Sequence, residues 1–202
     1  MKLYTGMGPN PRVVTIAVAE TGAEVESITV DLVAGENRKG EHLARNPAGQ
    51  LPTLETDDGQ FISEITAIAE YLDEKQGGSL LGSTAEERAE ARMWTRRIDL
   101  NIIEPLTNGF RYAEGLPLFE SRVHVIPQAA EDLKQIAQEQ LAALEAQMEG
   151  REYICGDRFT LADILLFAFL EFGGGVGQPL DAKCERLQAW YARVAARPSI
   201  AG

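Results

Sequence analysis

Two short stretches in the first third of the chain have residue types and spacing that suit a small charged ligand. Gln50-Leu51-Pro52 precedes a strand-like segment, and a helix begins at Ser63-Glu64. The start of a helix has free N–H groups and the positive end of the helix dipole, which favour an anion. One hypothesis is that both stretches hold a small peptide with an amine and carboxylates. The structural alternative is that Pro52 opens an edge strand and Ser63 only caps the helix.

The segments that must position these residues begin with an α/β pattern. The predicted strands are 2–5, 25–32, 52–56 and 60–62, with a hairpin turn at Asp57-Asp58-Gly59 joining the last two. One predicted helix has Asn10 as its N-cap and Pro11 as its first residue, and it stops at Gly22. A second runs over 63–76. The order β-α-β and then β-β-α predicts an N-terminal α/β domain, residues 1–76.

The rest of the chain is predicted to be helical. The expected helical segments are 84–112, 123–149 and 186–196, with a loop at 114–117. Thr160 and Asp163 form a capping box, which predicts a further helix start, because each side chain satisfies a backbone N–H of the other residue. The sequence therefore predicts a second, all-helical domain, residues 84–202.

Composition and charge argue against several classes of function. The net charge is -12 and no basic stripe offsets it, so nucleic acid and anionic membranes are not expected as partners. No apolar run approaches membrane-spanning length, and the start of the chain lacks the apolar core of a signal peptide. Cys155 and Cys184 have no metal-ligand spacing and indicate reduced thiols in the cytoplasm. His42 and His124 are too few for a histidine-built metal site, and no resident cofactor is expected.

Three motifs, in this order and at these separations, resemble the cytosolic glutathione transferases. They are NPAGQLPTLETDDG at 46–59, ISEITAIAEYLDE at 62–74 and GDRFTLADILL at 156–166. The resemblance covers nearly the whole chain. It implies a thioredoxin-like N-terminal domain followed by a helical C-terminal domain, glutathione as co-substrate, and a homodimer.

By position, Pro52 matches the family's cis-proline, and an X-Pro bond is the one peptide bond that is cis at low cost. The cis geometry would turn the N–H and C=O of Leu51 outward, to pair with the cysteinyl part of glutathione. Gln50, Asn37 and Lys39 fall near the expected position of the glycyl end. Each of these three is equally compatible with a solvated loop residue.

The resemblance assigns the γ-glutamyl end of glutathione to the helix start at Glu64-Ile65. The N–H groups there suit its carboxylate, and the Glu64 carboxylate suits its ammonium. Family members usually have a serine where this chain has Ile65, so only the backbone N–H serves at that position. The alternative for Glu64 is an ordinary acidic residue favoured by the helix dipole.

A transferase must stabilise the glutathione thiolate, which is the nucleophile. The family places Tyr, Ser or Cys in the turn after the first strand, but residues 5–12 contain no serine or cysteine, and Gly8 occupies the usual serine position. Asn10 would donate its side-chain amide to the sulfur, aided by the helix start. The alternative is that Asn10 is only an N-cap. Thr5 is the next candidate, ahead of Tyr4, which lies within the strand.

The second substrate is expected between the domains, against the helix over 84–112. Trp94, Phe110 and Tyr112 are the candidate lining residues, although each also suits a core position. Asp99 lies where a partner subunit's acidic residue reaches the γ-glutamyl ammonium in some classes. We expect conjugation of glutathione to small hydrophobic electrophiles. The alternatives are a reductase or isomerase using the same site, or a non-catalytic binding or regulatory relative.

Overall fold

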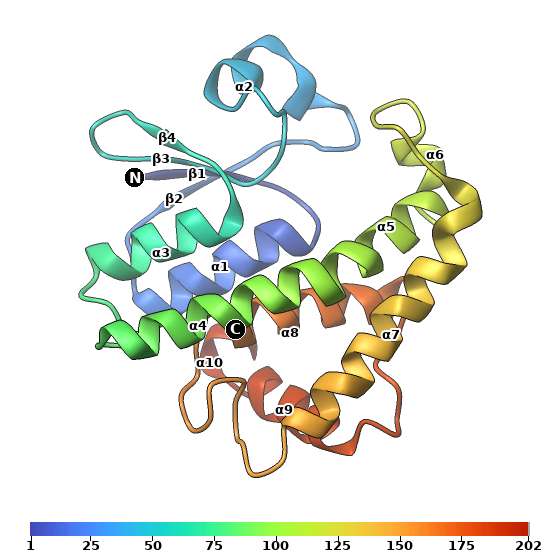
Figure 1. The fold of residues 1–202 in the computed structure, drawn as a ribbon. Coiled ribbons are helices and arrows are strands. Elements are labelled where there is room, and N and C mark those ends of the chain that lie inside the picture. The colour runs from blue at the N-terminus through green and yellow to red at the C-terminus, as the bar shows by residue number, and fades with distance from the viewer. Residues whose placement is uncertain (202) are drawn as a thin grey trace. The chain divides into compact units, whose positions relative to one another are not determined.

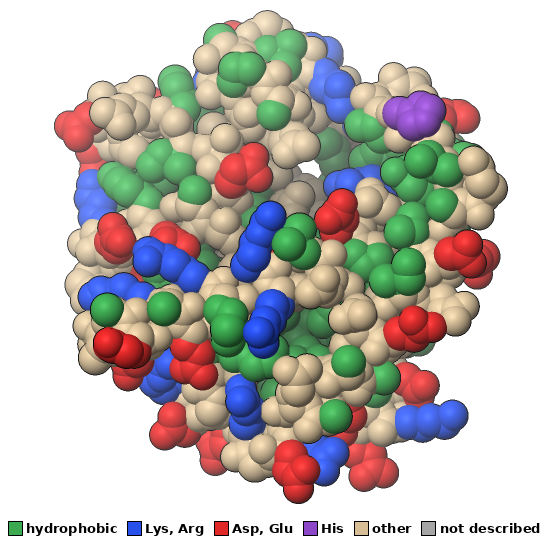
Figure 2. Space-filling view, viewed as in Figure 1, with side chains coloured by type: hydrophobic (Ala, Val, Ile, Leu, Met, Phe, Trp, Pro, Cys, Tyr) green, Lys and Arg blue, Asp and Glu red, His purple; other side chains and the backbone are tan. Residues whose placement is uncertain are grey.

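The computed structural model describes residues 1–201. Its contacts divide the chain into two units, Met1–Ser83 and a second unit that begins at Thr84. The first is a four-stranded mixed sheet with helices, and the second is helical, so the fold class predicted from the sequence is confirmed (Figure 1). Within residues 1–201, no helix is both long enough and apolar enough to span a membrane. On the face drawn in Figure 2, acidic and basic side chains are interspersed with apolar ones.

The first unit follows the predicted element order. Its strands are β1 (Lys2–Thr5), β2 (Glu26–Thr29), β3 (Thr53–Glu55) and β4 (Phe61–Ile62), and its helices are α1 (Pro9–Thr21), η1 (Glu36–Arg38), α2 (Gly40–Arg45) and α3 (Ile65–Lys75). The strand order is β2-β1-β3-β4; β1 is parallel to β2, and β3 is antiparallel to both of its neighbours. Helices α1 and α3 cover one face of this sheet and α2 lies over the other (Figure 1).

Alternation along β1 gives the sheet two apolar faces. Leu3 packs with Val14 of α1 and Ile68 of α3. The next residue, Tyr4, points to the opposite face and packs with Val30 and Leu51. Because successive strand residues face opposite sides, one short strand anchors both the paired helices and the loop before Pro52.

Both helix starts in this unit differ from the prediction. Helix α1 begins at Pro9 with Gly8 as its N-cap, so Asn10 is its second residue and not its cap. Helix α3 begins at Ile65 with Glu64 as its N-cap, so Ser63 does not cap it. Neither start has a side-chain cap hydrogen bond. The predicted caps were wrong because no polar side chain determines where these helices begin. Pro9 and Pro11 determine the start of α1, and a positive-φ turn at Glu64 determines the start of α3.

The second unit is built around one buried helix. Its elements are α4 (Ala85–Ile98), η2 (Asp99–Ile103), α5 (Glu104–Tyr112), α6 (Leu116–Phe119), η3 (Pro127–Ala129), α7 (Ala130–Gln147), α8 (Leu161–Gly175), α9 (Glu185–Ala195) and α10 (Pro198–Ala201). Every residue of α8 from Leu161 to Leu170 is buried, as expected for a helix surrounded by others. The predicted loop at 114–117 is correct for the turn at Glu114-Gly115 but too long, since α6 begins at Leu116. The helix predicted from 123 begins only at Ala130, after Pro127.

The predicted segment 84–112 is one long helical stretch interrupted by a π turn, η2 (Figure 1). Within it, the Glu104 N–H donates to the carbonyl of Asp99, five residues earlier. Pro105 follows directly and has no N–H to give to a carbonyl four residues back. The wider turn therefore absorbs the missing hydrogen bond without ending the helix.

Two helices of this unit, α4 and α8, begin with capping boxes. At α4, Thr84 Oγ1 accepts the Glu87 N–H and Glu87 accepts the Thr84 N–H, both at 3.1 Å. At α8, the predicted box of Thr160 and Asp163 is present, and Asp163 Oδ2 accepts the Thr160 N–H at 2.8 Å.

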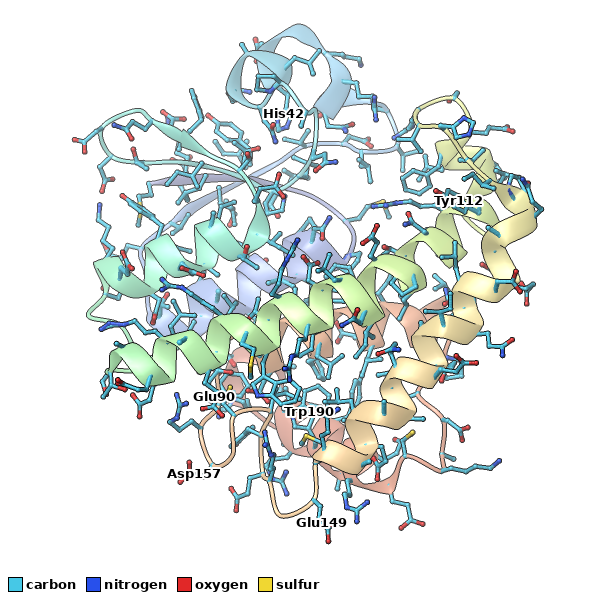
Figure 3. The ribbon with its side chains drawn as sticks, in the orientation of Figure 1. His42, Glu90, Tyr112, Glu149, Asp157 and Trp190 are labelled. Carbon is cyan, nitrogen blue, oxygen red and sulfur yellow. The ribbon has the colours of Figure 1, made fainter. Side chains whose placement is uncertain are left out.

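The Asp163 carboxylate has further donors. Its Oδ1 accepts the Ile154 N–H at 2.9 Å and the indole N–H of Trp190, on α9, at 2.8 Å (Figure 3). Burial raises the pKa of Asp163 to about 6, and these hydrogen bonds oppose that rise. One buried carboxylate thus joins a loop, α8 and α9.

Candidate functional site

Three neighbouring strands bring the N-terminal candidate residues to one end of the sheet. Tyr4 pairs with Thr53, so the same register places Gly6 opposite Leu51. Leu54 pairs with Ile62, which places Glu64 opposite Pro52. Contact confirms the first juxtaposition, because a Cβ built on Gly6 would lie 3.1 Å from Leu51 Cδ1. The turn into α1, the Leu51-Pro52 bond and the start of α3 therefore form a single surface.

The Leu51-Pro52 peptide bond is cis, as predicted. Leu51 directs its side chain to the core beside Tyr4 and Val30. Within residues 1–201, no hydrogen bond is found for the Leu51 N–H or C=O. A buried residue with both backbone groups unpaired can pair with an extended peptide, as an added strand does.

The loop before Leu51 is fixed by buried polar side chains. His42, on α2 and 3% exposed, has Nε2 at 2.9 Å from the Gln50 carbonyl oxygen (Figure 3). A carbonyl only accepts, so Nε2 carries the proton, and Nδ1 is buried with no partner among the described residues. Asn46 Nδ2 donates to the same oxygen at 3.1 Å and to Thr53 Oγ1 at 3.2 Å. These side chains hold the backbone on both sides of Leu51.

The structure gives the three residues expected at the glycyl end different surroundings. Asn37 is 3% exposed and its Nδ2 donates to the Gly49 carbonyl at 2.6 Å, so it holds the loop and does not reach outward. Gln50 and Lys39 are exposed, and no side-chain partner is found for either within residues 1–201. Sequence reasoning missed the positioning residues His42 and Asn46. The available signal was an Asn and a His four residues apart before the proline.

The start of α3 has an unusual backbone. Glu64 is the one non-glycine residue with positive φ among residues 1–201, at φ 71° and ψ 122°. Such a conformation costs of order 1–3 kcal/mol and persists where the surroundings impose it. The Glu64 side chain is exposed, Ile65 is half-buried, and no side chain caps the turn. The first N–H groups of α3 thus remain available to an anion, beside a carboxylate.

The start of α1 has few donors. Pro9 and Pro11 have no N–H, and the Arg12 N–H bonds the Gly8 carbonyl at 3.3 Å. Asn10 therefore supplies the only backbone N–H among residues 9–11. The half-buried side chains of Asn10 and Thr5 have no hydrogen-bond partner within the described chain. Both could donate to a ligand at the Leu51 edge, which is the surface formed by the turn into α1, the Leu51-Pro52 bond and the start of α3.

Tyr4 is unsuited to activate a thiol at this edge. Its hydroxyl donates to Glu55 Oε2 at 2.7 Å, and the Arg45 guanidinium stacks 4.3 Å from the ring centroid. The hydrogen bond to Glu55 raises the pKa of Tyr4, with burial adding to the effect. A tyrosine with a raised pKa and an engaged hydroxyl does not stabilise a neighbouring thiolate.

In the helical unit, the three candidate pocket residues do not belong together. Phe110 packs edge-to-face against Phe172 at 4.9 Å and Phe119 at 6.2 Å, and Tyr112 lies near the end of α5 (Figure 3). Trp94 is on α4, roughly 24 Å away along the helix by the rise per residue. It is 5% exposed, with Arg97 and Arg151 over its ring at 5.3 and 5.4 Å. The Trp94 ring is therefore part of the core, and a place for it in a second-substrate pocket stays a prediction.

The thiols of the chain itself are poorly suited to redox chemistry. Cys155 and Cys184 are both buried and form no disulfide. Burial raises the pKa of Cys155 to about 11, and nearby Asp163 and Glu90 add to the rise. Burial also raises the pKa of Cys184. Since the thiolate is the reactive form, neither side chain is a nucleophile at neutral pH.

Comparison with known domain families and proteins agrees with this geometry. Residues 1–74 match the glutathione S-transferase N-terminal domain, and residues 115–198 match the glutathione S-transferase C-terminal domain. The chain is 35% identical over 201 residues to glutathione S-transferase 2 of Saccharomyces cerevisiae, covering 97% of this chain and 85% of the relative. The chain therefore belongs to the glutathione S-transferase family, which supports a glutathione-binding function.

Two solved structures extend the comparison. A glutathione S-transferase domain-containing protein from Marinobacter aquaeolei VT8 is 39% identical with a TM-score of 0.93, covering 99% of this chain and 100% of that chain. The β-etherase LigF from Sphingobium sp. strain SYK-6 is 26% identical with a TM-score of 0.84, covering 99% and 96%. One fold thus carries proteins of different reported chemistry.

Proposed function

We propose that this protein is a glutathione transferase that conjugates the glutathione thiolate to small hydrophobic electrophiles. The observation that carries the proposal is the Leu51 edge, where unpaired backbone groups lie beside the uncapped start of α3. A peptide with a carboxylate and an ammonium at one end matches the donors and the acceptor present there. Family membership supports the same ligand.

In this proposal the cysteinyl part of glutathione pairs with the backbone of Leu51. The γ-glutamyl carboxylate accepts the first N–H groups of α3, and the γ-glutamyl ammonium pairs with Glu64. Ile65 contributes only its N–H. The glycyl end lies toward the exposed side chains of Gln50 and Lys39. None of these contacts requires a proton to move within the bound peptide, because its carboxylate and ammonium groups are already charged.

The thiol is activated at the start of α1. Asn10 donates its side-chain amide and its backbone N–H to the sulfur, and the helix dipole lowers the thiol pKa further. Two prolines leave this turn with fewer donors than an ordinary helix start, which increases the share carried by Asn10. Thr5 is the alternative donor, because its hydroxyl is unpaired at the end of β1.

A second candidate function uses the same site for a different glutathione-dependent reaction. The likeness to a β-etherase supports considering ether cleavage, in which the glutathione sulfur would bond to the ether carbon while the ether oxygen leaves. A glutathione-dependent reductase or isomerase on the same site is the further alternative. A non-catalytic binding or regulatory role is the third candidate, supported by the isoleucine at position 65 and the absence of Ser or Cys in the first turn. Disulfide chemistry by the chain itself is disfavoured by its buried thiols.

Calorimetric titration with glutathione, followed by conjugation of 1-chloro-2,4-dinitrobenzene, tests the proposal. We expect binding and catalysed loss of chloride. Glu64→Gln should weaken glutathione binding up to about fivefold, as loss of an exposed ion pair does. Glu74→Gln, an exposed change on the same helix, should not. Binding without conjugation would favour the non-catalytic role, and absence of binding would exclude both.

Further parts of the proposal follow the family. The protein acts as a homodimer in detoxification and needs no resident cofactor, because glutathione enters as co-substrate. Two unpaired thiols are compatible with the cytoplasm as its compartment. In the dimer, Asp99 would reach the γ-glutamyl ammonium bound by the partner. A sedimentation mass of one chain at micromolar concentration would contradict the dimer.

A further inference from the structure

One carbonyl in the loop before Pro52 has two side-chain donors. The Gln50 carbonyl oxygen lies 2.9 Å from His42 Nε2 and 3.1 Å from Asn46 Nδ2. His42 is on α2 and Asn46 is the C-cap of that helix, so both donors come from the same side of the loop. The Thr53 hydroxyl, at 3.5 Å, is too far for a bond of ordinary strength. Because the oxygen has two lone pairs, two separate donors stop it from turning about either bond.

Fixing this carbonyl also fixes the direction of the Leu51 N–H, because both belong to one planar peptide group. The Gln50-Leu51 bond is trans, since the one cis bond found among residues 1–201 is Leu51-Pro52. In a trans peptide group the C=O and the N–H point in opposite directions. The Gln50 C=O points toward its donors on α2, so the Leu51 N–H points away from that helix.

The Leu51 side chain provides a second anchor. It packs with Tyr4 and Val30 in the sheet core, and Leu51 is 7% exposed. With the side chain and the preceding carbonyl both fixed, the Leu51 N–H has one orientation before a ligand arrives. Hydrogen bonds to a carbonyl also polarise the N–H of the same peptide group, so the donor is strengthened as well as oriented. Preorganisation of this kind reduces the cost of ordering the site on binding.

Stability alone does not favour a histidine at position 42. The side chain is buried, and its Nδ1 has no partner in the part of the chain that the structure describes. A buried polar atom without a hydrogen bond costs free energy, and an apolar side chain of similar volume would not have that cost. After such a change the Gln50 oxygen would keep Asn46 as a donor. The loop should therefore stay folded while the carbonyl regains some freedom to turn.

We propose that His42 is a positioning residue that makes the site selective for peptides in which the cysteinyl carbon bears a carbonyl. The inference rests on the proposed function, in which the cysteinyl part of glutathione pairs with the Leu51 backbone. The Leu51 N–H donates to the cysteinyl carbonyl. His42 acts on that contact through the Gln50-Leu51 peptide group and does not touch the ligand. A ligand without this carbonyl gains nothing from the orientation of the N–H.

Two ligands that share the γ-glutamyl group and the thiol isolate the carbonyl. They are γ-glutamylcysteinamide and γ-glutamylcysteamine, which has a hydrogen in place of the carboxamide; glutathione is the parent ligand. Calorimetry measures the affinity of each ligand for the unmodified protein, His42→Met and His42→Gln. Methionine fills nearly the same volume and has no N–H, whereas the glutamine amide can donate from a similar position.

Thr56→Val is the matched control in the same unit. Thr56 is 7% exposed, and its Oγ1 accepts the Gln60 N–H at 3.1 Å. Valine keeps the shape and removes this one hydrogen bond. The position is at the far end of β3, roughly 13 Å from Pro52 by the rise per residue of a strand. The control therefore shows what the loss of one buried side-chain hydrogen bond does away from the Leu51 edge.

His42→Met should weaken binding of glutathione and γ-glutamylcysteinamide about fivefold, as loss of one well-placed hydrogen bond does, and that of γ-glutamylcysteamine less than about 1.5-fold. His42→Gln should restore most of the affinity, and Thr56→Val should change none of the three. Equal losses for all three ligands in His42→Met would overturn the inference. So would an unmodified protein that binds γ-glutamylcysteamine as tightly as γ-glutamylcysteinamide. Thermal unfolding identifies a folding defect, and His42→Leu replaces His42→Met if the latter does not fold.

The orientation of the N–H can also be measured without a ligand, which separates this inference from the proposed function. The amide residual dipolar coupling of Leu51 reports that orientation in the unmodified protein and in His42→Met. We expect the coupling to change at Leu51 and to stay the same in the rest of the sheet. If glutathione binds with the expected pattern but is not conjugated, the proposed function fails and the inference stands. If the Leu51 coupling is the same in both proteins, the inference is wrong, whether or not conjugation occurs.

Discussion

Two helix starts in each unit are built in opposite ways. In the helical unit, α4 and α8 begin with capping boxes whose side chains satisfy the first N–H groups. In the α/β unit, α1 and α3 begin without a side-chain cap, at residues with positive φ: Gly8 at 112° and Glu64 at 71°. Both uncapped starts border the Leu51 edge. The difference suggests that the two capped starts serve stability, whereas the starts of α1 and α3 leave donors for a ligand.

The largest expected effect is at the buried cap of α8. Asp163→Ala would leave the N–H groups of Ile154, Thr160 and Trp190 buried without an acceptor. We expect a loss of about 4 kcal/mol in the free energy of unfolding. The exposed cap at α4 is the control, since Thr84→Ala should cost about 1 kcal/mol. Urea unfolding measures both, and equal losses would contradict the ranking.

The next effect is on catalysis at the uncapped start of α1. Because Asn10 is not a cap, Asn10→Ala should leave stability nearly unchanged and slow conjugation by about ten- to thirtyfold, or 1–2 kcal/mol. Asn10→Asp adds a charge that favours the helix start but repels a thiolate. The Asp variant should therefore be at least as stable as the Ala variant and should conjugate glutathione more slowly. The reverse order of rates would point to Thr5 as the donor.

At the start of α3, function and stability should move in opposite directions. Glu64→Gly relieves the positive-φ conformation and should stabilise the fold by about 1 kcal/mol, while weakening glutathione binding up to about fivefold. Glu64→Gln loses the same charge but keeps the strain. Its melting temperature should therefore stay near that of the unmodified protein. A stabilised Gln variant would mean that charge, not backbone, sets the stability.

The pH dependence of stability tests the buried cap more finely. The folded pKa of Asp163 is raised to about 6 from 3.8, so the folded state binds this proton more tightly than the unfolded chain. Stability from this group should therefore rise by about 1 kcal/mol as pH falls from 7 to 5. Asp57, whose pKa Lys75 lowers to about 2, acts oppositely but only below pH 4. The Asp163→Asn variant should lack this increase in stability between pH 7 and pH 5. If the variant still shows the increase, another group is responsible for it.

The sequence was sufficient for the fold class because turn and helix signals are local. The hairpin at Asp57-Asp58-Gly59, the stop at Gly22 and the capping box at Thr160 each depend on neighbours within four residues. The cis Leu51-Pro52 bond was predicted by resemblance and is present.

What the sequence did not predict depends on contacts between distant segments. His42 holds the Gln50 carbonyl eight residues away, and Asn37 turns inward to Gly49. Trp94 and Phe110 share one helix, yet only the structure shows that the Trp94 ring is buried in the core.

The π turn between α4 and α5 makes the number of residues in this helical stretch a determinant of how α5 packs. It holds one residue more than an α-helical turn of the same span, and each residue rotates a helix by about 100°. Deleting one residue from Asp99–Ile103 would therefore rotate all of α5 relative to α4, carrying Phe110 away from Phe172 on α8. The two rings would keep their order in the sequence yet no longer meet. A one-residue deletion would thus break this aromatic contact without any substitution in it.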